Sequence, residues 1–255
     1  MNKTKILIYD IECTAALAYV WSQWDASVIA THTDWHLLSV AYKWKGDKKI
    51  HFRAIWDDPK WKAGSTDDRQ LTEHLRDLFD EADVLVAHNG DGFDQKKVNA
   101  RMLFHDIAPP SPYRSVDTLK VVRRNFKNYS NSLKELARLL SLDAKMETGG
   151  FGLWLDSMAG DRKAQKKMER YNRQDVVVLE ELYDRLTPWI TNINFSMYAD
   201  DLTVPACKHC ASDNVNRRGF QTSNVQTYQR WRCMDCGGWS RSRLAERPST
   251  RVQLV

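Results

Sequence analysis

The sequence predicts a mixed α/β fold, in which helices flank a sheet of parallel and antiparallel strands, followed by a small cysteine-rich β module. Three observations predict this organisation. Three β-rich segments open the chain, helical and β segments alternate after them, and four of the five cysteines lie beyond residue 206. A chain of 255 residues is long enough for one full-sized domain and a small appendage.

The first strand is predicted where an apolar, β-rich run, KILIYDIE, spans residues 5–12. Such a run is typical of a buried central strand. Two further strands are expected at 36–44 and 48–56, joined by a tight turn at 45–47. Later strands are expected at 84–88 and around 115–122.

Helices are predicted from the spacing of leucines and from capping residues. Asp67 or Asp68 can cap a helix over residues 71–82, whose leucines share one face. Ser132 and Glu135 match a capping box that opens another leucine-rich helix. Longer helices are expected up to about His105 and from about Asp161 to Leu186, with a glycine-containing loop at 143–160.

The net positive charge of the chain comes from its C-terminal part. From Pro205 onward the residues carry a net charge of +6, whereas the preceding residues carry −1. This excess predicts a polyanionic partner, and nucleic acid fits better than a membrane because no basic amphipathic helix accompanies it. We predict a domain at 1–190, a linker at 191–206 and the cysteine-rich module at 207–255.

The N-terminal segment MNKTKILIYD lacks the apolar stretch and the cleavage site of a signal peptide. No apolar run approaches the roughly 20 residues that cross a bilayer. We therefore expect a cytoplasmic location.

Two acidic residues, Asp10 and Glu12, lie in the first predicted strand. Residues two apart on a strand point to the same side of the sheet, so the two carboxylates are expected to lie together. Neighbouring carboxylates repel unless cations neutralise them, and hard oxygen ligands favour Mg²⁺ or Mn²⁺. The alternative is two exposed acids at the end of a strand.

A third acid, Asp94, follows a turn rich in glycine and asparagine. It can join the first two acids, or it can be an acid that a helix N-terminus favours. The neighbouring Phe93 can anchor the start of the helix in the core, or its ring can stack on a nucleobase.

Tyr171 and Asp175 are four residues apart in the long predicted helix, so they share one face. A phenol close to a metal-bound water could orient that water for attack on phosphorus. The alternative is a packed tyrosine beside a solvated aspartate. Basic residues surround this segment, and among them Arg173 is the main candidate for contact with phosphate, although a solvated helix face explains the others.

Together, DIE at 10–12, HNGDGFD at 88–94 and YNRQD at 171–175 resemble the three motifs of the DEDD 3′–5′ exonuclease superfamily. The tyrosine four residues before the last aspartate is similar to the DEDDy branch. The resemblance spans about residues 5–190 and implies a ribonuclease H-like fold. It also implies that Tyr171 positions the attacking water, that Asn89 and Phe93 touch the terminal nucleotide, and that the metal ligands are Asp10, Glu12, Asp94 and Asp175.

The cysteine-rich module contains two CxxC pairs separated by a β-type insert. This spacing is typical of a zinc ribbon, in which four thiolates hold one structural Zn²⁺. Gly237 is expected to let the backbone turn so that its amides face the thiolates, and His209 is expected to face solvent or substrate. The predicted zinc ligands are Cys207, Cys210, Cys233 and Cys236.

Arginines and aromatic residues alternate in the same module. This composition is typical of a nucleic-acid-binding surface, in which arginines bind phosphates and aromatic rings stack on bases. Alternatively, the aromatic residues form a miniature core and the arginines keep it in solution. The predicted substrate contacts are Arg217, Arg218, Arg230, Arg232, Trp231 and Trp239. The module resembles the zinc ribbons of transposase-like and phage nucleic-acid proteins.

The leading functional hypothesis is a two-metal-ion 3′–5′ exonuclease that releases nucleoside monophosphates from nucleic acid, with single-stranded DNA favoured. The combination of modules is similar to phage-encoded exonucleases, which would place the protein in the host cytoplasm, with replication or repair proteins as partners. One alternative is a ribonuclease or an oligoribonucleotide-degrading enzyme. Another is a nucleic-acid-binding adaptor that does not catalyse a reaction.

Overall fold

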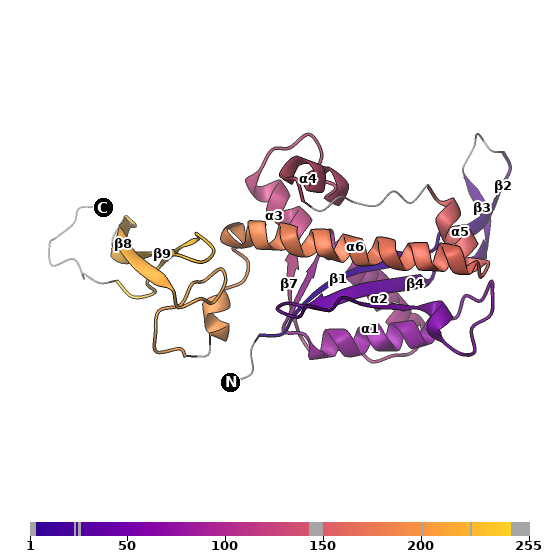
Figure 1. The fold of residues 1–255 in the computed structure, drawn as a ribbon, viewed down its shortest axis with the longest axis horizontal. Helices are drawn as coiled ribbons and strands as arrows, with labels where there is room; N and C mark the ends of the chain where they lie inside the picture. The colour runs from indigo at the N-terminus through magenta and orange to yellow at the C-terminus, as the bar shows by residue number, and fades with distance from the viewer. Residues whose placement is uncertain are drawn as a thin grey trace. The chain divides into compact units, whose positions relative to one another are not determined.

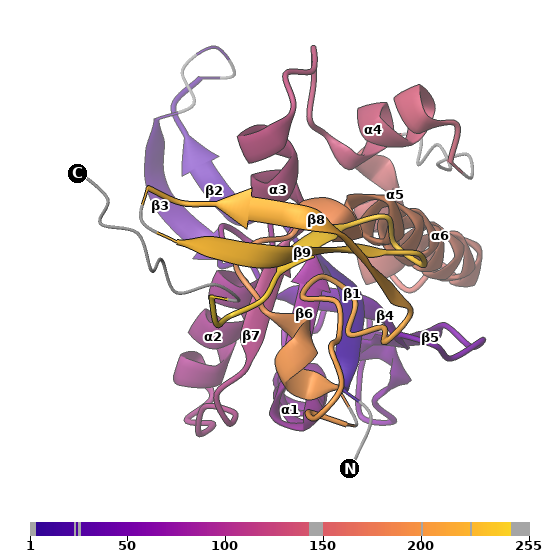
Figure 2. The same cartoon turned by 90° about the vertical axis from the view of Figure 1, so that its left-hand side faces the viewer.

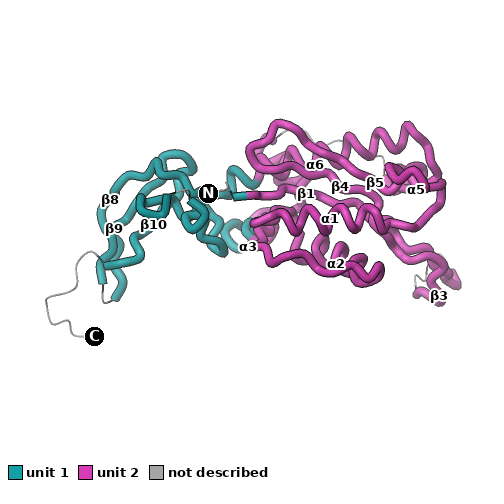
Figure 3. Tube along the Cα trace, turned by 90° about the horizontal axis from the view of Figure 1, so that it is seen from below, with its two compact units in different colours: residues 1–4, 121–127, 183–255 teal, residues 5–120, 128–182 magenta. Residues whose placement is uncertain are grey.

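The computed structural model describes residues 4–22, 24, 27–142, 150–199, 201–224 and 226–245. The chain divides into two compact units (Figure 3). The larger unit consists of Lys5–Lys120 and Asn128–Leu182, and the smaller consists of Met1–Thr4, Val121–Lys127 and Tyr183–Val255. The predicted division into 1–190, 191–206 and 207–255 stays a prediction.

The larger unit is built on a five-stranded mixed sheet, which confirms the predicted fold class. The strands lie in the order β5-β4-β1-β6-β7. β1 pairs antiparallel with β4 and parallel with β6, so it is the central strand. The strands are β1 (Ile6–Cys13), β4 (Leu37–Trp44), β5 (His51–Ala54), β6 (Val84–Ala87) and β7 (Arg114–Asp117).

One face of β1 packs into the apolar core, and the other carries the two acids. Leu7, Tyr9 and Ile11 belong to a core cluster that includes apolar side chains of α1 (Arg69–Glu81) and α2 (Asp94–Phe104). The alternating residues Asp10 and Glu12 point to the other face, because successive side chains along a strand point to opposite faces. Helix α6 (Arg162–Leu186) covers that face, whereas α1 and α2 lie on the opposite side of the sheet (Figure 1).

The strand predicted around 115–122 is shorter than expected. It ends at Asp117, and α3 (Thr118–Asn125) follows directly. The Asp117 carboxylate accepts hydrogen bonds from the backbone N–H groups of Leu119 and Lys120. This cap satisfies donors that a helix start leaves unpaired, so the chain turns into a helix where the sequence reads as a strand.

Several helix predictions are confirmed at their starts and ends. Ser132 accepts a hydrogen bond from the backbone N–H of Glu135 and caps α4 (Leu133–Leu140). The long helix α6 matches its predicted span within one residue. The loop predicted at 143–160 is wrong in its second half, which contains α5 (Gly152–Met158), because Leu153 and Ser157 are buried there. Residues 143–149 lie outside the described part of the chain.

A β-hairpin separate from the main sheet was not expected. β2 (Leu17–Val20) pairs antiparallel with β3 (Val28–Thr33) and forms a two-stranded sheet of its own. Most of its side chains are exposed, so the sequence shows no alternation of buried and exposed positions. Such alternation is the signal that identifies most strands.

The smaller unit holds a three-stranded antiparallel sheet in the order β10-β9-β8. Short 3₁₀ helices at Thr187–Trp189 and Phe195–Tyr198 precede it. Its strands are β8 (Val215–Thr222), β9 (Thr227–Cys233) and β10 (Trp239–Arg241). Figure 2 shows β8 and β9 side by side. Among the helices of the described segments, none combines the length and the apolar character needed to cross a membrane.

Candidate metal centres

The fold brings together acids that lie near the beginning and near the end of the larger unit's sequence. Asp10 and Glu12 on β1 and Asp175 on α6 each offer a carboxylate oxygen, and these oxygens all lie within 4.8 Å of one another. Asp175 is buried, with 3% of its surface exposed, while Asp10 and Glu12 are half-buried. Oxygen donors in this number suit a hard divalent cation, whose charge offsets the mutual repulsion of the acids. The donor set therefore fits Mg²⁺ or Mn²⁺.

Asp94 lies beside this group of three acids without belonging to it. It is the first residue of α2, and its Oδ1 accepts a 3.4 Å hydrogen bond from the backbone N–H of Ile11, between the two acids of β1. Its side chain is buried. Burial raises the pKa of Asp94 to about 7.

Tyr171 lies one helical turn before Asp175 and is hydrogen-bonded to it. The Tyr171 ring packs edge-on against Trp154 of α5, with 6.0 Å between ring centroids. Burial raises the pKa of Tyr171 well above its usual value, and the charges of Asp175 and Glu12 raise it further. The phenol therefore stays protonated at neutral pH, where it can donate a hydrogen bond but cannot act as a base.

Asn172 is a residue of this site that the sequence analysis missed. It is fully buried, and its Nδ2 donates to Asp10 Oδ2 at 2.7 Å and to the Asp10 carbonyl oxygen at 3.1 Å. Its Oδ1 accepts a 3.1 Å hydrogen bond from the hydroxyl of Ser39 on β4, which is also buried. The available signal was its position three residues before Asp175, which places both residues on one helix face.

The turn before Asp94 is ordered by another acid. Asp117 is buried and accepts hydrogen bonds from the backbone N–H groups of Asn89 at 3.0 Å and Asp91 at 3.3 Å. Asn89 has a φ of 71°, a left-handed conformation that asparagine tolerates better than most residues. Phe93 at the end of the turn is 42% exposed, so its ring is accessible. The structure thus gives Asp117 a role in shaping the turn.

Arg173 is held on another side of α6 from the acids. Its Nε donates to Glu169 at 2.9 Å, and its guanidinium also contacts the carbonyl oxygen of Ile50. Residues two apart on a helix do not face one another, so Arg173 and Asp175 diverge. Contact between Arg173 and substrate stays a prediction.

The four cysteines beyond residue 206 form a second group of metal-ligating side chains. Their sulfur atoms all lie within 4.8 Å of one another. The sulfurs of Cys207 and Cys236 are 3.7 Å apart, and those of Cys210 and Cys233 are 3.6 Å apart. A tetrahedron with metal–sulfur bonds of about 2.3 Å has edges of about 3.8 Å. The thiols therefore fit a tetrahedral Zn²⁺.

The turns that carry the cysteines have the geometry of zinc knuckles. Gly237 has a φ of 76°, which favours glycine, and the N–H of Gly238 points at the sulfur of Cys236 at 3.4 Å. A Cβ atom at Gly238 would lie 2.6 Å from the ring of His209. Both glycines are therefore required by the local geometry, as the sequence suggested for Gly237.

The expectation that His209 faces solvent or substrate is wrong. Only 3% of its surface is exposed. Its Nδ1 lies 2.8 Å from the carbonyl oxygen of Ile190, and its Nε2 lies 3.1 Å from that of Trp239. The imidazole is buried between these two backbone carbonyl oxygens, to which a ring N–H can donate a hydrogen bond.

Several arginines of this module lie over aromatic rings. Arg217 lies 5.2 Å from the ring centroid of Trp231, and Arg230 lies 4.7 Å from that of Trp239. Arg232 is 5.9 Å from the Trp239 ring. The aromatic residues of the module are thus contacted by arginines rather than packed only into a core.

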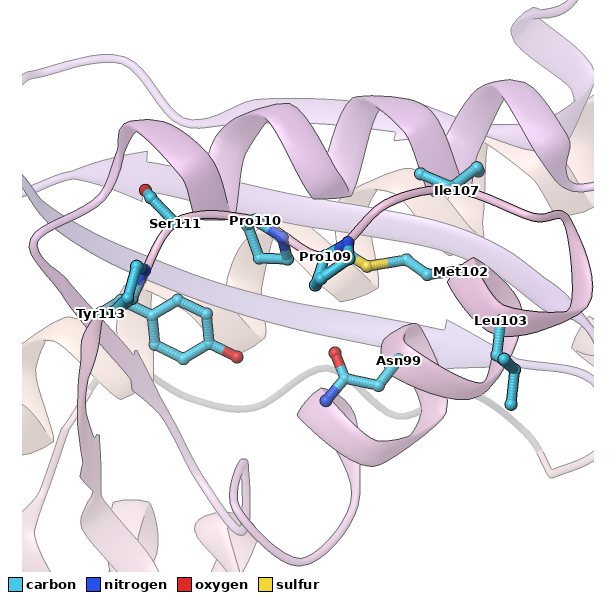
Figure 4. Close-up of a pocket in the computed structure, with 9 residues that line it drawn as sticks. Asn99, Met102, Leu103, Ile107, Pro109, Pro110, Ser111 and Tyr113 are labelled. Atoms are coloured by element: carbon cyan, nitrogen blue, oxygen red, sulfur yellow. The ribbon is translucent and has the colours of Figure 1, made fainter.

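A separate hollow of about 450 Å³ lies between the end of α2 and the proline-containing segment that follows it (Figure 4). Its lining is mainly apolar and includes Met102, Ile107 and Tyr113. None of the predicted site residues contributes to it. This hollow is therefore distinct from the group of acids.

Comparison with known proteins identifies the fold. The model of a family described as the RNase H superfamily matches residues 29–187, a range that includes Asp94, Tyr171 and Asp175 but begins after Asp10 and Glu12. Among solved structures, a family B DNA polymerase from the hyperthermophilic archaeon Pyrobaculum calidifontis is similar, with a TM-score of 0.51 and 16% identity. The alignment covers 73% of this chain and 26% of the polymerase. No curated protein matches the chain.

Proposed function

Because the chain belongs to the RNase H superfamily, we propose that it is a metal-dependent nuclease that removes nucleotides from the 3′ end of nucleic acid. The observation that carries this proposal is the convergence of Asp10, Glu12 and Asp175 beside a half-buried, protonated Tyr171. Acids grouped in this way suit divalent cations, and the superfamily supports a nuclease. The 3′–5′ polarity rests on the resemblance of the three motifs to the DEDDy exonucleases.

In this proposal Asp10, Glu12 and Asp175 hold the cations, and Asp94 completes the ligand set from α2. Two bound cations would supply charge stabilisation for the attacking and the leaving oxygens of the phosphodiester. The hydrogen bond from Asn172 fixes the orientation of Asp10, so the ligand does not have to be ordered when cations bind.

Tyr171 is proposed to orient the attacking water. Its raised pKa keeps the hydroxyl protonated, so its contribution is a hydrogen bond rather than removal of a proton. Asn89 and the exposed ring of Phe93, on the turn before Asp94, are proposed to contact the terminal nucleotide. Stacking of a ring on a base is tolerant of sequence, as removal of successive nucleotides requires.

The zinc module is proposed to hold the substrate. It carries the net positive charge of the chain, and Arg230 and Arg241 lie over aromatic rings. This combination suits a single strand, whose phosphates and bases are both accessible. The likeness to a DNA polymerase supports DNA as the substrate.

The test is the incubation of the protein with end-labelled single- and double-stranded DNA and RNA in Mg²⁺, Mn²⁺ or a chelator. We expect loss of nucleotides from the 3′ end of single-stranded DNA that depends on Mg²⁺ or Mn²⁺. Asp10→Asn, which keeps the size of the side chain but removes its charge, should abolish cutting while the protein stays folded.

The same gel decides between the alternatives. Preferential cutting of RNA identifies a ribonuclease. Binding without cutting under every metal condition identifies an adaptor, and a folded Asp10→Asn protein with an unchanged rate excludes the proposed active site.

A further inference from the structure

The two faces of the ribbon sheet differ in exposure along β9, whereas β8 is exposed on both faces. Along β9 the inward side chains Gln229 and Cys233 are buried, whereas Arg230 and Arg232 between them are exposed. Gln229 Nε2 donates to the carbonyl oxygens of Gly219 and Arg230, which uses both N–H donors of the side chain inside the ribbon. At β9, one face of the sheet therefore packs toward the interior of the ribbon, and the other faces solvent.

The register of β10 adds two residues to the solvent-facing side. Trp239 pairs with Arg232, and Arg241 pairs with Arg230. Directly opposed residues project from the same face of an antiparallel sheet, so these four side chains share the outer face. Tyr228, two residues before Arg230, lies on this face as well.

Contacts across the strands order these side chains. The guanidinium of Arg241 lies 4.0 Å from the ring centroid of Tyr228, and that of Arg230 lies 4.7 Å from that of Trp239. The Nε of Arg230 also donates to the carbonyl oxygen of Arg218. Arginines held in this way lose less conformational freedom when they bind an anion than free side chains do.

The arginine nearest to Trp231 belongs to the other face. Arg217 pairs with Trp231, which alternates with the buried Gln229 and Cys233. Ser240, opposite Trp231, accepts a hydrogen bond from the backbone N–H of Lys208 within the ribbon. Arg217 and Arg241 therefore each cover an aromatic ring of β9, but they do so on opposite faces.

We infer that the outer face, formed by Tyr228, Arg230, Arg232, Trp239 and Arg241, is the surface of the ribbon that binds a single strand of nucleic acid. Three arginines and no acid occupy the β9 and β10 positions of this face, so it is complementary to phosphates. The Trp239 ring is 44% exposed and offers a surface on which a base can stack. This assignment rests on the proposed function and specifies where the ribbon acts.

The experiment compares Arg232→Ala and Arg241→Ala, on the outer face, with Arg217→Ala, on the inner face. Each change removes one positive charge, so a general charge effect is equal in all three. The full-length chain carries Asp10→Asn to keep the probe intact, and binding of a fluorescent single-stranded oligothymidylate is followed by anisotropy at several salt concentrations. Bound zinc is measured in each variant to show that the ribbon is folded.

We expect each outer variant to weaken binding by about 3- to 10-fold and to reduce the slope of log affinity against log salt by about 0.7, the value for one phosphate contact on a single strand. Arg217→Ala should change both quantities much less. Equal effects of the inner and outer variants, with zinc retained in all, would overturn the assignment of the face.

Failure of this inference is distinguishable from failure of the proposed function. If the wild-type chain degrades oligonucleotides but the three arginine variants bind alike, only the assignment of the face is wrong. If the wild-type chain neither cuts nor binds nucleic acid, both are wrong.

Discussion

Asn172 connects three elements at the level of single atoms. Its amide accepts a hydrogen bond from Ser39 on β4 and donates to Asp10 on β1, while the residue itself lies on α6. Because Nδ2 faces two oxygens of Asp10, the orientation of the amide is fixed. A buried amide with all of these partners positions the carboxylate that it contacts.

We predict that Asn172→Ala weakens cation binding by about 10- to 100-fold, because loss of a supporting hydrogen bond usually costs this much. Binding of Mn²⁺ measured by electron paramagnetic resonance and the Mg²⁺ dependence of the rate both report this change. Ser39→Ala, which removes the more distant partner, should have a smaller effect. Unchanged Mn²⁺ affinity in a folded Asn172→Ala protein would show that the amide has only a structural role.

Tyr171 can be tested with a change of a single oxygen atom. Tyr171→Phe keeps the ring that packs on Trp154 but removes the hydroxyl that is bonded to Asp175. We expect kcat to fall by about 10²- to 10³-fold, the range for loss of one hydrogen-bond donor directed at the reacting atoms, while oligonucleotide affinity stays the same. A single-turnover rate equal to wild type would remove Tyr171 from the mechanism.

At the level of elements, a buried acid joins two helices and a strand. Asp68, at the N-terminus of α1, accepts two hydrogen bonds from Arg101 and one from His105, both at the end of α2. It also accepts a 2.8 Å hydrogen bond from the backbone N–H of Leu37 in β4. The sequence suggested Asp68 as a helix cap, but its side chain makes no cap bond to α1.

Loss of this carboxylate should destabilise the larger unit. We predict that Asp68→Ala lowers the free energy of unfolding by about 3–5 kcal/mol, because the charge of Arg101 would stay buried without its partner. Asp67→Ala is the matched control, since Asp67 is exposed and accepts a hydrogen bond from the backbone N–H of Arg69 at the same helix start, and it should cost about 1 kcal/mol. In urea titrations, the unfolding free energies of the two variants should differ by at least about 2 kcal/mol, the gap between the two predicted losses. Coincident unfolding curves would contradict the role of Asp68.

At the scale of the whole molecule, the two units use different sources of stability. The larger has an extended apolar core around β1, α1 and α2. The sheet of the smaller unit exposes nearly every side chain of β8. We expect this sheet, which has so little core of its own, to rely on bound metal for its folding free energy.

We therefore predict that Cys207→Ser combined with Cys210→Ser removes one zinc per chain and unfolds the ribbon. Binding of long oligonucleotides should weaken and become less dependent on salt, whereas cutting of very short ones should continue at a similar rate. Zinc analysis and gel assays with substrates of two lengths measure both effects. Equal loss of activity on short and long substrates would show that the ribbon does more than hold substrate.

Features set by neighbours along the chain could be read from the sequence. The alternation of β1 placed Asp10 and Glu12 on one side, the helical repeat placed Tyr171 with Asp175, and CxxC spacing identified the four thiols. Ser132 capped α4 as expected. Each feature depends on backbone geometry over a few residues, which residue type and spacing determine directly.

Other features depended on segments that meet only in the folded chain. The approach of Asp175 to Asp10, the bond from Asn172 to Asp10 and the burial of His209 against Ile190 each join residues far apart in sequence. The separation of Arg217 from Arg241 onto opposite faces required the register of three strands. The sequence by itself therefore determined which side chains are available for chemistry, and the tertiary structure decided which of them meet, because long-range packing sets those distances.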